Sequence, residues 1–201
     1  MRNKKVIKMV QLAILIAITL LMAFTPIGYI RTGGLAIQMI MIPVTVGAMI
    51  LGPGAGALLG LVFGLTSFWQ CFGLDPFGAQ LLSINPFFTF LLCVPTRTLV
   101  GFLTGVLFNG IKKIDKSNTI SYFAGGLLGA MLNTAIFMSS LMLLFYNTDY
   151  IQSFNTSGKN IIAFIISFVA LNGFLEWPVT SIAGGIVSKA VSRFLRKTEI
   201  E

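Results

Sequence analysis

Residues 120–146 have the sequence ISYFAGGLLGAMLNTAIFMSSLMLLFY, a run of 27 residues without a charged side chain. A helix needs about 20 consecutive apolar residues to cross the hydrocarbon core of a bilayer, which is about 30 Å thick. The rest of the chain has the same character, because 56% of its 201 residues are hydrophobic and only 10% are charged. Soluble domains carry about 25% charged residues. The sequence therefore predicts an all-α integral membrane protein.

Short polar breaks divide the chain into six apolar runs, which predict a compact bundle of six transmembrane helices in a single membrane domain over residues 1–201. We expect these helices at about 6–25, 36–51, 54–69, 86–109, 120–146 and 160–190. The second and third are short, since 16 residues of helix cover only about 24 Å. They either cross a thinned part of the bilayer or form a re-entrant hairpin, and the sequence leaves both arrangements open.

The basic residues predict the orientation of the bundle. Eleven of the 14 Lys and Arg residues lie in the N-terminal segment, in the break after the fourth helix or in the C-terminal segment. These three segments face the same side in a six-helix arrangement. Cytoplasmic segments carry an excess of Lys and Arg, so we expect the N- and C-termini in the cytoplasm.

Several function classes are disfavoured by composition. The net charge of +8 comes from residues gathered at helix ends, not from a basic face interleaved with aromatics, so nucleic-acid binding is not expected. The chain has no histidine, no Walker A sequence and no HExxH sequence, which argues against catalysis, ATP hydrolysis and a metal site. Cys71 and Cys93 form no CxxC unit, and we interpret them as small apolar residues. No cofactor is expected.

Two ionisable residues stand inside apolar runs, Arg97 in the fourth predicted helix and Glu176 in the sixth. A charged residue at the bilayer centre costs about 2.5–3.5 kcal/mol on insertion scales, so such residues face the protein interior or a wet cavity. The two lie at similar depth. They form a buried ion pair, contact a polar ligand, or do both.

Other polar and aromatic residues lie near the same layer. Asn133 is in the fifth predicted helix, and Asn172 precedes Glu176 by one helical turn. We predict a pocket that opens outward, with apolar walls and a few fixed polar groups. The candidate substrate-binding residues are Arg97, Asn133, Asn172, Glu176, Trp177, Asn85 and Trp69. The alternative for Trp69 is a place in the outer aromatic belt of the membrane.

Glycines recur every four residues along the third predicted helix, at Gly52, Gly56, Gly60 and Gly64. Such a stripe lets another helix backbone approach closely. We therefore expect these four residues to serve helix packing, with a direct ligand role as the less favoured alternative.

Two stretches resemble a known family. Residues 42–67, IPVTVGAMILGPGAGALLGLVFGLTS, and residues 95–101, PTRTLVG, are similar to segments of the substrate-binding S components of energy-coupling factor (ECF) transporters. The resemblance covers most of the chain and implies a non-catalytic subunit of the bacterial plasma membrane that captures a water-soluble vitamin. It is strongest to the branch associated with pantothenate, with riboflavin and pyridoxine as other candidate ligands.

The same resemblance implies partners for ATP-driven uptake. These are a transmembrane coupling subunit and two ATPase subunits, which would hydrolyse the ATP. In the family, small residues on the first helix pack against the coupling subunit, and Ala13 and Ala17 match those positions.

Two other functions remain open from the residues alone. An ion-coupled secondary transporter of a small polar solute would use Arg97 and Glu176 for ion coupling, but the sequence shows no inverted repeat and only one intramembrane carboxylate. A scaffold protein without a ligand would use its buried polar residues only for helix packing.

Overall fold

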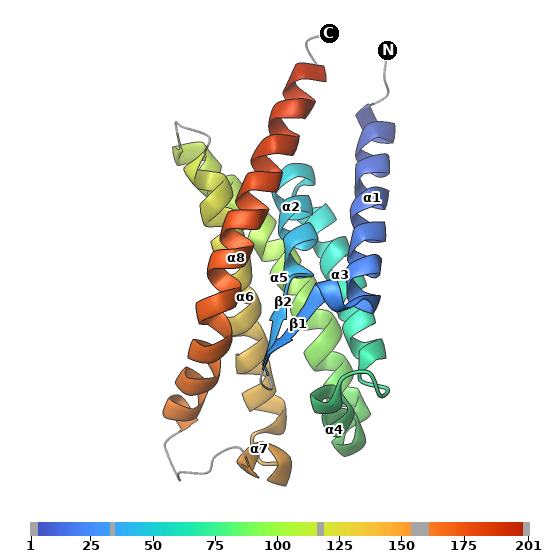
Figure 1. Ribbon diagram of the computed structural model, residues 1–201, viewed down its shortest axis with the longest axis vertical. Coiled ribbons are helices and arrows are strands. Elements are labelled where there is room, and N and C mark those ends of the chain that lie inside the picture. The colour runs from blue at the N-terminus through green and yellow to red at the C-terminus, as the bar shows by residue number, and fades with distance from the viewer. Residues whose placement is uncertain (1–3, 33–34, 116–118, 154–160, 199–201) are drawn as a thin grey trace.

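The computed structural model of the chain describes residues 4–32, 35–115, 119–153 and 161–198, and the side chains of some of these, 161–175 among them, lie outside the description. The described part is a bundle of helices with one small two-stranded sheet (Figure 1). In chain order the elements are α1 (Lys4–Phe24), η1 (Pro26–Gly28), β1 (Tyr29–Thr32), β2 (Leu35–Gln38), α2 (Met41–Leu51), α3 (Pro53–Gln70), α4 (Pro76–Ile84), α5 (Pro86–Ile114), α6 (Ile120–Phe145), α7 (Asp149–Ser153) and α8 (Ile161–Thr198).

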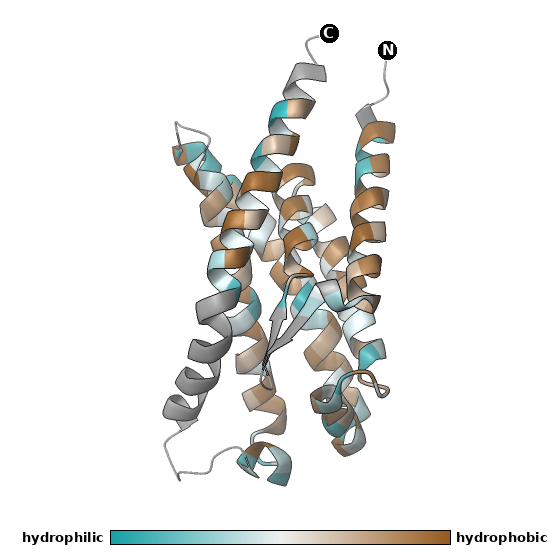
Figure 2. Ribbon diagram, viewed as in Figure 1, coloured by the Kyte–Doolittle hydropathy of each residue, from teal (hydrophilic) through white to brown (hydrophobic). Residues whose placement is uncertain are grey.

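Three of the described helices are long and apolar enough to cross a membrane: Lys5–Phe24 of α1, the whole of α5 and the whole of α6. At a rise of about 1.5 Å per residue, the 29 residues of α5 extend about 44 Å, which exceeds the hydrocarbon thickness. Figure 2 shows hydrophobic residues along most of α1 and α2. The chain is thus a multi-pass membrane protein.

The chain is helical as predicted, apart from a small hairpin in the segment between α1 and α2. β1 and β2 pair as an antiparallel hairpin, with Tyr29 opposite Gln38 and Thr32 opposite Leu35. The residues between the strands are Gly33 and Gly34, a dipeptide typical of two-residue hairpin turns. The helix expected over 36–51 consequently begins only at Met41.

Two short helices, α4 and α7, lie in segments where no helix is predicted. Both are found at the end of the bundle opposite the start of α1 and the end of α8 (Figure 1). The start of α4 has ordinary capping chemistry: Pro76 is its first residue, and the Asp75 carboxylate accepts a hydrogen bond of 3.0 Å from the Gly78 amide. These helices extend the bundle on this side.

α3 packs along α5 through its glycines. A Cβ atom on Gly64 would lie 2.8 Å from the Cys93 carbonyl oxygen, and one on Gly60 would collide with the Arg97 carbonyl oxygen. Gly56 meets the backbone of Gly101 in the same way. Only glycine permits this approach of two backbones, so this contact sets the position of Arg97 relative to α3.

Gly52 has a different place from the other three glycines of its stripe. It lies in the turn between α2 and α3 with φ of 101°, and a Cβ atom there would meet nothing within 4 Å. A positive φ favours glycine because other residues suffer steric strain. The backbone angle, not helix packing, requires glycine at this position.

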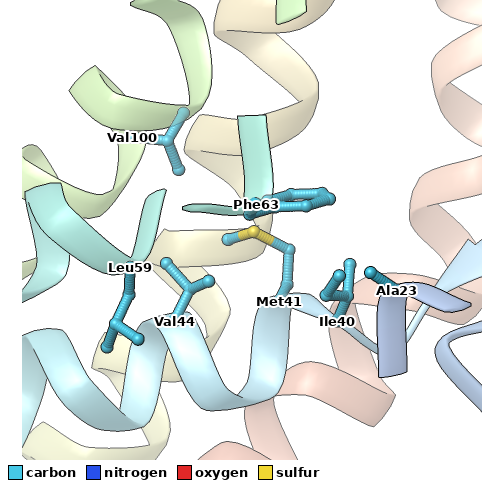
Figure 3. Packing of buried hydrophobic residues seen from close by; sticks show 7 residues of the cluster. All are labelled: Ala23, Ile40, Met41, Val44, Leu59, Phe63 and Val100. Carbon is cyan, nitrogen blue, oxygen red and sulfur yellow. The ribbon is translucent and has the colours of Figure 1, made fainter. Parts of the chain in front are cut away.

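Buried apolar side chains from four helices and the residue before α2 form a core beside this contact (Figure 3). Phe63 of α3, which has no exposed surface, lies next to Met41 of α2. The other members of the cluster are Ala23, Ile40, Val44, Leu59 and Val100. This packing holds the Phe63 ring in place on the side that faces α5.

The basic residues gather at one end of the bundle. The start of α1, the end of α5 and the end of α8 lie at that end, while α4 and α7 lie at the other (Figure 1). The described basic residues at this end are Lys4, Lys5, Lys8, Lys112, Lys113, Lys189, Arg193, Arg196 and Lys197. Lys189 donates a hydrogen bond of 2.9 Å to Thr119, next to the start of α6.

Candidate ligand-binding site

Three polar side chains from three helices are buried together in the bundle. Arg97 of α5 is 5% exposed, and Asn133 of α6 and Glu176 of α8 are each 4% exposed. α6 packs against both α5 and α8, and Glu176 interacts with Asn133 at short range and with the charge of Arg97 at longer range. The structure thus brings together three of the residues that the sequence nominates.

Arg97 is held between two aromatic rings. Its Cζ atom lies 4.6 Å from the ring centroid of Phe63 on α3 and 5.0 Å from that of Phe137 on α6. Such cation–π contacts stabilise a guanidinium without using its N–H groups. Nε and Nη1 of Arg97 are buried and have no hydrogen-bond partner in the described part of the chain. The fork of donors is therefore available to a carboxylate, whose two oxygens match it.

Arg97 and Glu176 do not form the contact ion pair that the sequence leaves open. Oε1 of Glu176 is buried without a hydrogen-bond partner among the described residues, and so is Oδ1 of Asn133. A buried polar atom left without a partner costs about 1–3 kcal/mol. The cluster therefore presents unused donors on Arg97 and unused acceptors on Asn133 and Glu176. A ligand that carries both hydrogen-bond acceptors and hydrogen-bond donors could satisfy them.

The hairpin adds two polar residues that the sequence interpretation missed. Nδ2 of Asn133 donates a long hydrogen bond of 3.5 Å to Oε1 of Gln38 at the end of β2. Tyr29 is opposite Gln38 in the sheet, so both side chains are on the same face. The Tyr29 hydroxyl is buried with no hydrogen bond of ordinary geometry among the described residues, although the Gln70 side chain is nearby, so it is available as a donor.

The sequence did contain an indication that Gln38 belongs with the buried polar residues. Gln38 is the one residue with a side-chain amide between residues 35 and 51, a stretch that is otherwise almost entirely apolar. Because residues 36–51 were assigned to one helix, Gln38 was not included among the candidate binding residues. A helix over this range gives no reason to expect Gln38 close to Asn133.

Trp177 and Asn172 are the remaining candidates on α8. The indole Nε1 of Trp177 donates a hydrogen bond of 3.2 Å to the Thr134 hydroxyl, which joins α8 to α6 beside the polar cluster. Asn172 is within α8, but its side chain lies outside the described residues.

The structure does not bring Asn85 or Trp69 to the cluster. Oδ1 of Asn85 accepts a hydrogen bond of 3.1 Å from the Phe88 amide and caps the start of α5. Twelve residues of helix separate Asn85 from Arg97, a rise of about 18 Å. Trp69 is 64% exposed and lies beside Phe72, with 6.2 Å between ring centroids. This exposure is what the aromatic-belt interpretation predicts.

Ala13 and Ala17 are exposed on α1. The opposite side of α1 packs Leu12, Leu15 and Ile16 against the apolar core. The described residues include no group of three His, Cys, Asp or Glu side chains that could hold a metal ion.

Comparison with known proteins identifies the family. Residues 7–187 match the family described as the substrate-specific component of ECF transporters. The chain is also 30% identical over 189 residues to a protein named pantothenate transporter PanT from Leuconostoc mesenteroides subsp. mesenteroides, an alignment that covers 88% of this chain and 87% of that protein. The chain therefore belongs to the family of ECF transporter substrate-specific components.

Proposed function

We propose that this chain is the high-affinity binding subunit of an ECF-type importer and that it captures pantothenate. The observation that carries this proposal is the convergence of Arg97, Asn133 and Glu176, each at least 95% buried and each with unpartnered polar atoms. The similarity to a protein named for pantothenate transport adds support. Riboflavin, pyridoxine or a related micronutrient is the next candidate.

The functional groups of pantothenate suit the groups of the cluster. Pantothenate carries one carboxylate, one amide and two hydroxyls. The Arg97 fork is complementary to the carboxylate. The hydroxyls can donate to Glu176, and the amide can exchange hydrogen bonds with the side-chain amide of Asn133. Phe63 and Phe137, which hold Arg97, leave its donors for the ligand.

The proposal includes six membrane crossings and cytoplasmic termini. The described basic residues gather at one end of the bundle, where α1 starts and α8 ends. This distribution supports the proposed orientation, because cytoplasmic segments carry an excess of Lys and Arg. α2 has 11 residues and extends only about 16 Å. Extended residues 35–38 of β2 precede it, and strand plus helix together make the second crossing. The polar cluster is then reached from the outside, past the hairpin.

Uptake is proposed to need partners, namely a transmembrane coupling subunit and two ATPase subunits of the bacterial plasma membrane. The exposed Ala13 and Ala17 support α1 as the docking helix, because small exposed residues let a partner helix approach closely. This chain itself would do no catalysis.

The test is equilibrium binding of a vitamin panel to the purified chain alone in detergent, with pantothenate, riboflavin and pyridoxine included. Saturable pantothenate binding without ions or partners supports the proposal. Tight binding of another vitamin keeps the capture function but changes the ligand. A folded protein that binds pantothenate only in an ion gradient in liposomes, and transports it alone, would instead be an ion-coupled carrier.

A further inference from the structure

The only two cysteines of the chain meet in the structure. The Sγ atoms of Cys71 and Cys93 are 4.0 Å apart, and the residues are 3% and 4% exposed. Cys71 directly follows α3, and Cys93 lies on α5, one turn before Arg97. Both residues belong to a buried apolar cluster with Val94, as their interpretation as small apolar residues predicts, and the fold also places their thiols in contact although 21 residues separate them in sequence.

We propose that Cys71 and Cys93 are a modification site at which a reversible disulfide ties the end of α3 to α5. A disulfide requires the two sulfurs to approach to about 2.05 Å, so they must move about 2 Å closer than in the reduced protein. α3 and α5 are in close contact on this face, because Gly64 packs directly on the Cys93 carbonyl and on Val94, and Cys71 lies two turns, about 10 Å, further along α3. The Cys71 side chain covers part of this distance, since its Sγ reaches back along α3 to within 3.3 Å of the Ser67 carbonyl oxygen.

The chemistry is thiol–disulfide exchange with a disulfide-bearing oxidant. One cysteine thiolate attacks the oxidant, forms a mixed disulfide and releases one thiolate. The second cysteine thiolate then attacks the protein sulfur of the mixed disulfide and releases the second thiolate. The protein loses two protons and two electrons, and the oxidant is reduced to two thiols.

Other uses of the pair have less support. The described residues around it contribute no third metal ligand from the His, Cys, Asp and Glu set, whereas zinc sites in proteins use three or four protein ligands. The polar neighbours of the thiols are the Ser67 hydroxyl, 4.0 Å from Cys93 Sγ, and the Ser67 carbonyl, 3.3 Å from Cys71 Sγ. The other neighbours are the apolar side chains of Val94, Leu61, Phe68 and Leu82.

Access to the pair is through the segment after Cys71. Residues 72–74 are exposed and form the turn that leads to α4. Opening of this turn would bring the Cys71 thiol to the surface while Cys93 stays on its helix. This end is opposite the basic residues, and in the proposed orientation it faces the outside of the cell, where disulfides persist. That compartment assignment rests on the proposed function, but the sulfur geometry does not.

The experiment uses the purified full chain in detergent. The reduced protein is treated with oxidised glutathione, then denatured and alkylated with N-ethylmaleimide, and its intact mass is measured. The expected product has lost about 2 Da and carries no maleimide, since one disulfide removes two hydrogens. Its apparent melting temperature should rise by about 5 °C. Cys71→Ser and Cys93→Ser should each lack both effects.

A matched sample, oxidised after unfolding in denaturant, shows that the reagent is active. If the unfolded chain forms the disulfide but the folded chain keeps two alkylatable thiols, the proposal is overturned. A folded chain that gains only glutathione adducts, or one whose melting temperature falls when the disulfide forms, also overturns it. Because no vitamin is used, the outcome is independent of ligand binding.

Discussion

Arg97 lies over the ring of Phe63, with 4.6 Å between its Cζ atom and the ring centroid, while Nε and Nη1 keep their hydrogen-bonding capacity unused. The Phe63 ring is fully buried and fixed by the apolar core that α1, α2, α3 and α5 form. The charge is therefore stabilised by a rigid aromatic surface before a ligand arrives. Preorganisation of this kind lowers the entropy cost of binding.

Replacing Arg97 with Gln should weaken pantothenate binding about 10- to 100-fold. A hydrogen bond to a charged group is worth about 1.5–3 kcal/mol, and Gln offers neither the charge nor the planar fork. Titration calorimetry of the purified variant measures this loss. Arg97→Lys should bind with intermediate affinity, because it keeps the charge without the fork.

The control for Arg97 is a change in the ligand. Panthenol has a hydroxymethyl group in place of the pantothenate carboxylate. If Arg97 contacts the carboxylate, wild type and Arg97→Gln should bind panthenol with similar affinity. An equal loss for both ligands would mean that Arg97 supports the fold of the site and does not contact the carboxylate.

Removing the Tyr29 hydroxyl should weaken binding without weakening the protein. The hydroxyl is buried and unpartnered in the described structure, so Tyr29→Phe relieves a cost in the unliganded protein and removes one donor to the ligand. We expect about a fivefold lower affinity, from a hydrogen bond of about 1 kcal/mol, and an unchanged or higher melting temperature.

Tyr122→Phe is the control for Tyr29→Phe, because it removes a tyrosine hydroxyl that has a hydrogen-bond partner and lies away from the polar cluster. The Tyr122 hydroxyl donates a hydrogen bond of 2.7 Å to Ser192, at the basic end of the bundle and away from the cluster. This variant should melt at a lower temperature and bind pantothenate normally. If Tyr29→Phe behaves like Tyr122→Phe, the hairpin has no part in binding.

The polar cluster could be predicted because membrane burial makes polar residues conspicuous. Arg97, Asn133 and Glu176 each interrupt an apolar helix at similar depth, and lipid exposure of such groups is costly, so their helices must turn them inward. The regular spacing of Gly56, Gly60 and Gly64 likewise indicated a close helix contact. In the first case the cost of exposing a polar side chain to lipid restricts where the residue can lie. In the second, only a very small side chain fits at a close helix contact.

The hairpin, α4 and the cysteine pair could not be predicted in this way. The Gly33–Gly34 dipeptide favours a turn, but the four-residue strands on either side are too short to show an alternating pattern, and β2 leads into an apolar helix. The contact of Cys71 with Cys93 depends on the rotation of α3 relative to α5, which no local pattern specifies. Asn85 was misleading because an Asn before Pro-Phe-Phe suits a pocket entrance and a helix cap equally well.

Asn85→Ala should lower stability and leave ligand affinity unchanged. Loss of the cap on α5 costs about 1 kcal/mol. Asn85→Asp keeps an oxygen acceptor for the Phe88 amide and should restore most of the melting temperature. Both variants should bind pantothenate like the wild type, and reduced affinity in the well-folded Asp variant would return Asn85 to the binding site.

Gly60→Ala should destabilise the protein by about 1–3 kcal/mol, because the added methyl group collides with the Arg97 carbonyl and forces α3 away from α5. Ligand affinity should fall as well, since Arg97 moves with its backbone. Thermal melting and calorimetry measure the two effects. Gly110→Ala is the matched control on α5: a methyl group there meets nothing within 4 Å, so both stability and affinity should be retained.

Bulky residues on the exposed side of α1 should block transport but not binding. Ala13 and Ala17 are exposed, so surface changes of up to about 0.5 kcal/mol are expected for Ala13→Leu together with Ala17→Leu. Pantothenate affinity should stay within about twofold of wild type, and the melting temperature should change by no more than about 2 °C. If a coupling subunit packs on this side, the double variant should fail to copurify with it and lose ATP-dependent uptake in proteoliposomes. Ala135→Leu, an equivalent change on the exposed side of α6, should retain uptake. Normal uptake by the α1 variant, or equal loss in the α6 variant, would place the docking surface elsewhere.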